Sequence, residues 1–294
     1  MDQNHWRAER FEETRGHLRA VAYRMLGSVG EADDAVQEAW LRFNRTDTTD
    51  VTNLGGWLTT VVARVCLDML RSRKSRGEEP LTEAKPVALD PHRAPSDPEQ
   101  EVLLADSVGL ALLVVLETLG PAERLAFVLH DMFDLSFDEI APIVGRSPEA
   151  ARQLASRARR RVRGAGTPDA DRARQRKVVE AFLAAARAGD FQGLLAVLDP
   201  DVVRHIDAAG VAPGAPTEMR GAQAVAKAAL AGSRRASAPV ALALIDGTVG
   251  VILAPHGRLT LAMRFETRDD RIVRIDVVAG PERLGTLNVA VLED

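Results

Sequence analysis

A stretch of 29 residues ending at Arg163, LSFDEIAPIVGRSPEAARQLASRARRRVR, predicts two short helices joined by a tight turn. Ser136 is placed to cap the first helix, and Glu139 three residues later completes a capping box. Gly145 suits the left-handed end of that helix, because glycine has no Cβ. Ser147, followed directly by proline, is then placed to cap the second helix.

The second of these helices has two chemically different faces. Its apolar stripe consists of small and aliphatic residues at helical spacing: Ala151, Leu154, Ala155, Ala158 and Val162. Its other side chains are mostly cationic: Arg152, Gln153, Ser156, Arg157, Arg159, Arg160 and Arg163. Because forked guanidinium groups suit phosphates and guanine edges, the pattern indicates a helix-turn-helix whose second helix enters the major groove of DNA. The alternative is a basic, solvated face on a structural helix.

Charge is distributed unevenly along the chain, although the formal net charge is only -4. Residues 141–176 hold ten arginines and three acids, whereas residues 78–106 hold eight acids and two basic residues. Such asymmetry indicates one element that contacts nucleic acid and another that avoids or mimics it.

Composition limits the class of protein. The 294 residues suffice for about two or three domains of a soluble globular protein. Cys66 is the only cysteine, which excludes an intrachain disulfide and fits a reducing cytoplasm. The N-terminus has no apolar signal segment, and the longest apolar run, Gly109–Leu116, is too short to span a bilayer. We predict a cytoplasmic protein with no membrane partner. The histidines lack ligand spacing and no glycine-rich phosphate loop is present, so we predict neither a metal nor a cofactor.

The first part of the chain is predicted to be helical, with Ser28 and Glu31 forming a second capping box. In the helix that follows, one face is acidic and polar with a single apolar residue: Asp33, Asp34, Gln37, Glu38 and Leu41. This face suits docking on a basic partner protein, and the alternative is an ordinary solvated face.

A later helix carries an aromatic residue, a hydroxyl and arginines along one side: Trp57, Thr60, Arg64, Asp68 and Arg71, followed by Arg73, Lys74 and Arg76. Such a face suits single-stranded or melted nucleic acid, because an aromatic ring can stack on bases and cations can follow phosphates. Alternatively, Trp57 belongs to the core.

Composition also divides the chain. Residues 78–101 are acidic and proline-rich, which predicts an extended linker, and residues 164–171 predict a second one. Beyond them, helices are followed by strand candidates at 202–207, 240–245, 248–254, 259–267 and 272–278. This order predicts a compact α+β domain with a cavity between helices and a curved antiparallel sheet, and a short tail at 285–294.

Three stretches resemble bacterial sigma factors of the extracytoplasmic-function (ECF) type, in the sigma-70 family. They are GSVGEADDAVQEAWLRF, GGWLTTVVARVCLDMLRSR and LGPAERLAFVLHDMFDLSFDEIAPIVGRSPEAARQLASRARRRV. The resemblance covers roughly half the chain. It implies two all-α domains, sigma region 2 at residues 7–77 and sigma region 4 at residues 102–164, joined by the linker at 78–101.

The resemblance also implies partners, namely core RNA polymerase (β′ clamp and β subunits) and promoter DNA. The acidic face would dock on the clamp through Asp33, Asp34, Gln37, Glu38 and Leu41. The −10 element would be melted and recognised by Asn53, Trp57, Thr60, Arg64, Arg71, Arg73 and Lys74. The −35 element would be contacted by Arg152, Gln153, Ser156, Arg157, Arg160 and Arg161.

Residues 172–284 resemble a SnoaL-like domain, a cone-shaped fold shared with small polyketide cyclases. In sigma factors that carry this domain, it is understood to regulate activity in place of a separate anti-sigma protein. The Trp-Leu-Pro motif usual in the linker of that group is not present, and only Pro80-Leu81 is similar. Two other motifs of the group are altered: its Asp-Gly-Gly-Gly motif is reduced to Asp207-Ala208-Ala209-Gly210, and its Asn-Pro-Asp-Lys-Leu motif appears only as Gly280-Pro281-Glu282-Arg283-Leu284. The candidate regulatory residues are His205, Asp207, Gly210, Pro281 and Arg283.

Three roles stay open for this domain: catalysis, binding of an unknown small ligand, and intramolecular contact with the sigma core, which we favour. His205 and Asp207 alternate on a predicted strand, so both can face one cavity, where such a pair could serve acid–base chemistry. We predict a sigma factor that is not an enzyme and whose activity its own C-terminal domain modulates. The alternative is a conventional helix-turn-helix regulator with a ligand-binding C-terminal domain, which would need neither the acidic helix nor the Trp57 helix.

Overall fold

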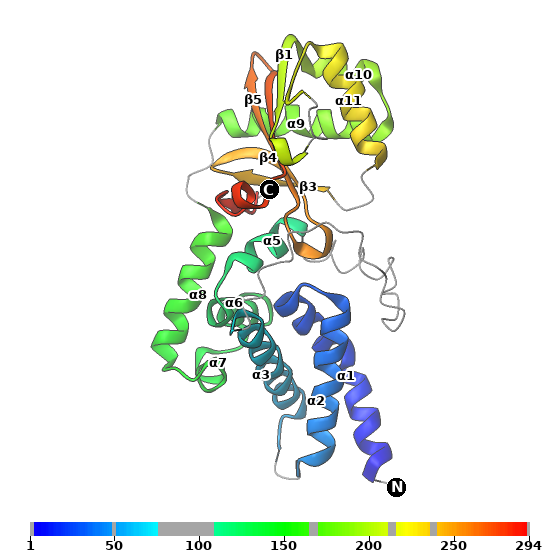
Figure 1. Cartoon of the computed structure of the whole chain (residues 1–294). Helices are drawn as coiled ribbons and strands as arrows, with labels where there is room; N and C mark the ends of the chain where they lie inside the picture. Colours follow the sequence, from blue (N-terminus) through cyan, green and yellow to red (C-terminus); the bar gives the residue numbers. More distant parts are fainter. Residues whose placement is uncertain are drawn as a thin grey trace. The chain divides into compact units, whose positions relative to one another are not determined.

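The computed structural model describes residues 3–48, 51–75, 109–164, 170–210, 216–235 and 240–292. The chain divides into two units, residues 1–108 with 116–160 and residues 109–115 with 161–294. The acidic linker predicted at 78–101 lies outside the described residues, as do residues 102–108 and most of the second linker. Figure 1 shows the order of the elements.

The N-terminal helices of the first unit are α1 (Gln3–Leu26), α2 (Val29–Arg45) and α3 (Leu54–Ser75). Gly27 ends α1 with a left-handed backbone, φ +74°. The predicted capping box at the start of α2 is only half formed. Ser28 accepts a hydrogen bond from the backbone N–H of Glu31, but the carboxylate of Glu31 pairs with Arg73 of α3 instead of returning to Ser28.

The core between these three helices is largely apolar and partly aromatic. Phe11 of α1 and Phe43 of α2 are fully buried, and the Phe11 ring lies 5.0 Å from the ring of Trp40. Cys66 of α3 is buried as well, and burial raises the pKa of its thiol to about 12, so the thiol stays protonated at neutral pH.

The first unit continues with shorter helices. They are α5 (Leu110–Thr118), whose N-terminal half belongs to the second unit, α6 (Pro121–Phe127), the π-helical turn η1 (Val128–Met132), α7 (Phe137–Val144) and α8 (Pro148–Arg163). Within the first unit, α6 and α7 both pack against α3. The two helical groups that the sequence predicted as separate domains therefore share a packed face.

Arg124 of α6 is the buried charge at that face, with a relative exposure of 2%. Its guanidinium donates hydrogen bonds to the carbonyls of Met25 and Leu116, each at 2.7 Å, and pairs with Glu117 at 3.0 Å. The carbonyl of Met25 lies in the last turn of α1, beyond the reach of the N–H groups of that helix, and the carbonyl of Leu116 lies in the last turn of α5, where it also accepts a hydrogen bond from the N–H of Leu119 at 3.2 Å. Arg124 thus caps α1 and α5 at once, a role that the sequence alone did not reveal.

The second unit contains the helices α9 (Ala170–Ala188), α10 (Phe191–Val197), α11 (Ala222–Arg235) and α12 (Pro281–Leu284) and two 3-10 turns, η2 (Ala208–Gly210) and η3 (Pro255–Gly257). Its strands are β1 (Leu198–Ile206), β2 (Glu218–Arg220), β3 (Val240–Ile245), β4 (Thr248–Leu253), β5 (Leu261–Arg268), β6 (Arg271–Val278) and β7 (Val289–Ala290). They form one sheet in the order β2-β1-β6-β5-β4-β3-β7. Only the β1–β6 pairing is parallel among these described strands, so the predicted α+β domain with an antiparallel meander is confirmed.

The prediction of a short tail at 285–294 needs correction. Val289 and Ala290 form β7, which pairs with β3 and closes that edge of the sheet. A two-residue strand has no periodicity that a sequence pattern could detect, because its pairing depends on a partner about 45 residues away.

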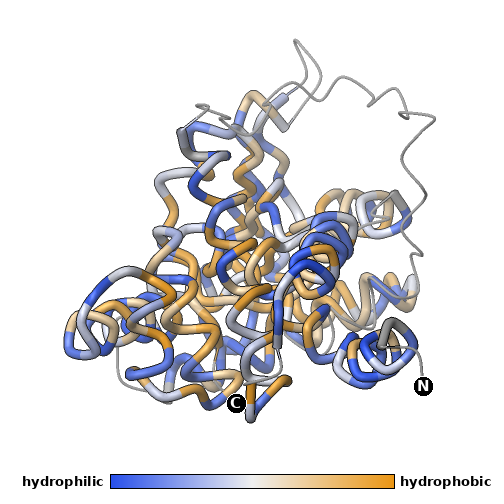
Figure 2. Tube along the Cα trace, turned by 90° about the horizontal axis from the view of Figure 1, so that it is seen from below, coloured by the Kyte–Doolittle hydropathy of each residue, from blue (hydrophilic) through white to orange (hydrophobic). Residues whose placement is uncertain are grey.

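Both faces of this sheet are covered by apolar side chains. Along β4, Val251 belongs to the core under α9 and α11, whereas Ile252 points to the opposite face. On that opposite face, Leu110, Val114 and Val115 of α5 pack in one cluster with sheet residues such as Ile245. Figure 2 shows how hydrophobic and hydrophilic residues alternate along the helices and strands. Among the helices that the structure describes, none is both long and apolar enough to cross a bilayer.

Candidate nucleic-acid interface and internal cavity

The helix-turn-helix forms as its sequence predicts. Ser136 and Glu139 make the reciprocal capping box of α7, and Gly145 ends this helix with φ +70°. The hydroxyl of Ser147 accepts a hydrogen bond from the backbone N–H of Ala150 at 3.2 Å, and α8 begins at Pro148. The turn is therefore held by local hydrogen bonds.

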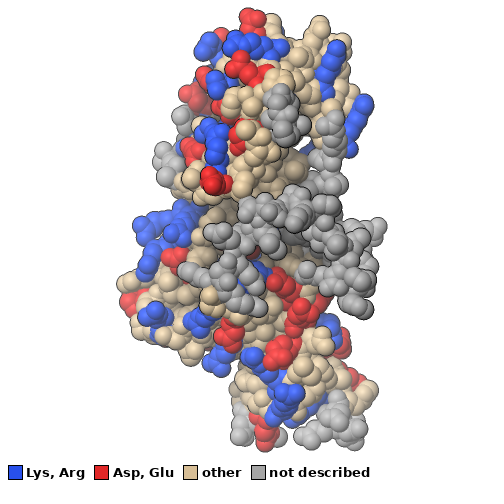
Figure 3. All heavy atoms as spheres, viewed as in Figure 1, with Lys and Arg blue, Asp and Glu red and all other residues tan. Residues whose placement is uncertain are grey.

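The inner face of α8 is fully buried at three alanines, Ala151, Ala155 and Ala158. The opposite face exposes the predicted −35 residues Arg152, Gln153, Ser156, Arg157, Arg160 and Arg161. In Figure 3, lysine and arginine side chains gather on the left of the view, where Figure 1 places α8. This face combines cations with an amide and a hydroxyl, which are the side chains that contact phosphates and base edges.

The arginines of α8 differ in how they are held. Arg152 pairs with Glu149 at 2.7 Å and lies over the ring of Phe137, and Arg159 pairs with Asp131. Arg157 and Arg160 form no ion pair or hydrogen bond with any residue that the structure describes. These two cations are therefore free to meet an anionic partner. The last turn, with Arg161, groups with the second unit.

The acidic face of α2 is exposed, as predicted. Asp34 and Gln37 are exposed, and Leu41 keeps 40% of its surface accessible, which is high for a large apolar side chain. Asp33 pairs with Arg19 at 2.7 Å, and Glu38 pairs with Arg42 at 2.9 Å. The face thus presents one apolar contact among carboxylates, two of which already have partners on the same unit.

The predicted −10 residues lie along α3 and just before it. Arg64 and Arg71 are exposed, and Thr60 donates its hydroxyl hydrogen to the carbonyl of Gly56 at 3.0 Å. The side-chain oxygen of Asn53 accepts a hydrogen bond from the N–H of Gly56 at 2.9 Å, so this residue caps α3. The structure does not describe the side chain of Lys74.

Two members of this set have contacts within the protein. The ring of Trp57 is half-buried with its centroid 5.9 Å from that of Phe43, so this residue packs partly in the core, and its contact with nucleic acid stays a prediction. The guanidinium of Arg73 pairs with Glu31 and its side chain is about a quarter exposed, so its contact with the −10 element stays a prediction. Arg73 lies two residues after Arg71, about 200° around the helix, and so on the side of α3 that faces Glu31 rather than on the exposed face.

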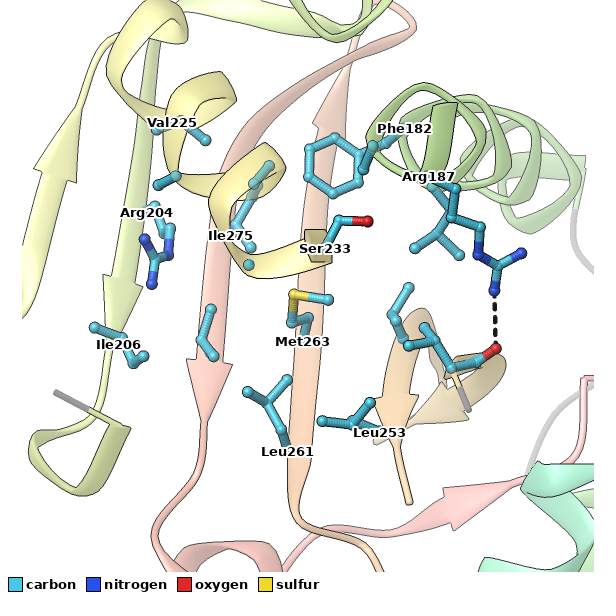
Figure 4. A pocket seen from close by; sticks show the side chains of 18 residues that line it. Phe182, Arg187, Arg204, Ile206, Val225, Ser233, Leu253, Leu261, Met263 and Ile275 are labelled. Atoms are coloured by element: carbon cyan, nitrogen blue, oxygen red, sulfur yellow. Dashed lines mark hydrogen bonds between the residues drawn. The ribbon is translucent and has the colours of Figure 1, made fainter. Parts of the chain in front are cut away.

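The second unit encloses a cavity of about 520 Å³ between α9, α11 and one face of the sheet. Figure 4 shows its lining side chains, which include Arg204 and Ile206 from β1. His205 and Asp207 do not line this cavity, and the prediction that they face it is wrong. Successive residues of a strand point to opposite faces, and the helices cover the face of Arg204 and Ile206.

Asp207 instead connects the two segments predicted to be regulatory, residues 207–210 and 280–284. Its carboxylate accepts hydrogen bonds from the backbone N–H groups of Ala279 and Gly280, at 3.0 and 2.9 Å, and Arg283 lies 4.0 Å away. Pro281 opens α12 directly after Gly280, and the N–H of Gly210 donates to the carbonyl of Asp207 at 2.9 Å. Four of the five candidate residues therefore meet at one corner of the domain.

Within the described part of the chain, no group of three potential metal ligands occurs.

The comparison with known proteins agrees with these elements. The chain matches Sigma-70 region 2 at residues 10–76 and Sigma-70, region 4 at residues 109–162. It is 38% identical over 289 residues to the ECF RNA polymerase sigma factor SigJ of Mycobacterium tuberculosis, which covers 93% of this chain and 91% of SigJ. The chain belongs to the ECF RNA polymerase sigma factors.

A second relative belongs to the same family, and a crystal structure of SigJ is available for comparison. The probable ECF RNA polymerase sigma factor SigI of Mycobacterium tuberculosis is 42% identical and covers 69% of each chain. The crystal structure of SigJ is 33% identical, covers 95% of this chain and 98% of that one, and superposes with a TM-score of 0.45. The predicted function as an RNA polymerase sigma factor is thereby confirmed, and the alternative of a conventional regulator is set aside.

Proposed function

We propose that this ECF sigma factor docks on the β′ clamp through the acidic face of α2, contacts the −10 element through α3, and contacts the −35 element through α8. The observation that carries the proposal is the pair of exposed arginines, Arg157 and Arg160, which have no partner among the described residues and lie on the outer face of α8, a helix capped by Ser147. The exposed Leu41 among acids supports the docking role of α2. Run-off transcription with purified core polymerase tests the whole assignment, which fails if the full-length chain yields no promoter-dependent transcript.

Replacing Leu41 with aspartate is expected to lower the affinity for core polymerase about tenfold, because a charge would replace the single apolar contact of the docking face. The measurement is a binding titration of labelled core polymerase. Trp6→Asp is the matched control, since Trp6 of α1 is equally exposed at 40% but lies outside the acidic face. Equal losses in the two variants would contradict the assignment of this face.

We further propose that the C-terminal domain modulates the sigma core by holding part of it. Two contacts within the second unit support this. The apolar side chains at the start of α5 pack on the sheet, and the backbone N–H of Val291 donates to the carbonyl of Val162, in the last turn of α8, at 2.8 Å. The domain thereby holds α5, the first described helix of region 4, and the end of the −35 helix. A structural change in the domain can therefore alter both. The cytoplasmic location and an unknown small ligand stay predictions.

Val289→Asp tests this coupling from the C-terminal side, because Val289 is 5% exposed in the cluster that contains α5. A buried charge in that cluster is expected to loosen α5 and to speed the hydrogen exchange of its amides by about tenfold or more. Promoter-dependent transcription is expected to change as well. Thr286→Asp adds the same charge at an exposed position nearby and should alter neither quantity. Unchanged transcription despite faster exchange would refute the modulating role.

A further inference from the structure

The cavity of the second unit has the dimensions of a ligand site. Its volume of about 520 Å³ lies within the range of small-molecule pockets, roughly 300–1,000 Å³. Aliphatic and aromatic side chains such as Phe182, Val251 and Leu261 form most of its wall. An occupant would therefore be mainly apolar, since polar atoms against such a wall would lose their hydrogen bonds to water.

Only a few of the described side chains that line the cavity are polar, and two of these are arginines. Arg187 of α9 is already engaged, because its guanidinium donates to the carbonyl of Val240 at 2.9 Å. Arg204 of β1 forms no hydrogen bond or ion pair with the residues that the structure describes. Figure 4 shows these two arginines on opposite sides of the cavity, with Ser233 between them.

The half-buried Arg204 is a cation without a counter-ion among the described residues. Burial lowers the pKa of its guanidinium, because the charged form loses part of its hydration. An uncompensated charge beside apolar walls is unfavourable, so the site gains by accepting an anion. A planar, forked guanidinium matches a carboxylate, which can accept two parallel hydrogen bonds. A phosphate dianion would be less well neutralised by one arginine.

We propose that this cavity binds an apolar monocarboxylate, such as a medium-chain fatty acid, with Arg204 holding the carboxylate and the apolar wall holding the body. The site belongs to the C-terminal domain alone and needs neither polymerase nor DNA. Binding can therefore be measured on the isolated full-length chain, and its failure would leave the sigma-factor function untouched.

Isothermal titration calorimetry with decanoate, below its micelle concentration, tests the proposal. One decanoate per chain is expected, and decanol, which has the same chain without the charge, should bind about tenfold or more weakly. Arg204→Met is expected to weaken decanoate binding about tenfold or more and to leave decanol unchanged. Arg271→Met, at an exposed position of β6 outside the cavity, is the control and should bind decanoate as the unaltered chain does.

Three results would overturn the proposal: no saturable binding of decanoate, equal affinity for decanol, or full affinity in Arg204→Met. If circular dichroism shows that Arg204→Met does not fold, Ala229→Phe takes its place. Ala229 lines the cavity from α11, so a phenyl ring there occupies the space while Arg204 remains. Loss of decanoate binding in this variant supports the site within the cavity, and unchanged binding overturns it.

Discussion

Replacing Arg124 with methionine is expected to lower the free energy of unfolding of the first unit by about 3 kcal/mol. Methionine fills a similar volume but cannot donate to the carbonyls of Met25 and Leu116, which Arg124 now bonds at 2.7 Å. Two helix ends would lose their cap together with a favourable charge at their negative ends. Glu117, whose side chain is 34% exposed, would also lose its partner but can be hydrated, which limits the loss.

Urea unfolding followed by tryptophan fluorescence measures this effect on the correct unit, because Trp6, Trp40 and Trp57 are the three tryptophans of the chain. Arg146→Met is a matched control, since Arg146 is exposed in the turn before α8. Its effect should stay within about 0.5 kcal/mol. A loss below about 1 kcal/mol in Arg124→Met would mean that water replaces the lost donor and that the face between α6 and α3 is not tightly packed.

Replacing Arg157 and Arg160 together with glutamine is expected to weaken binding to −35 duplex DNA about 10- to 100-fold at moderate salt. Neither guanidinium has a partner within the described part of the chain, so both can neutralise phosphates on binding. Each phosphate contact that is lost should reduce the slope of log affinity against log salt by about 0.9. The double variant should therefore flatten the slope by about 2.

Fluorescence anisotropy over a salt series measures both quantities, with a labelled duplex that the unaltered chain has selected from a random library. Arg10→Gln with Arg15→Gln is the control, because it removes the same charge from α1, where each arginine already pairs with a glutamate. A weaker affinity with an unchanged salt slope would contradict phosphate contact by these arginines. It would mean that they contact the bases only. An unchanged affinity of the double variant would contradict the assignment of α8 to the DNA interface.

Local chemistry explains why so much of the fold is predictable. The caps at Ser136 and Ser147, the left-handed Gly145 and the turn at Asp246-Gly247, with φ +51° and +83°, involve residues only a few positions apart. Each element forms where its own residues favour it, so most helix and strand ends are visible in the sequence. The outward α8 arginines and the exposed Leu41 follow from the same helical periodicity.

What the sequence determines by itself is thus the kind of each element, the order of the domains and the chemistry of the outer helix faces. The tertiary structure decides which face of a strand meets the cavity, and it places Arg204 there rather than His205. It also decides that Arg124 caps a helix end 99 positions away and that β7 closes the sheet. The physical reason is that the hydrophobic periodicity of a sequence predicts only that a residue will be buried. Its partner depends on packing between segments that are distant in sequence.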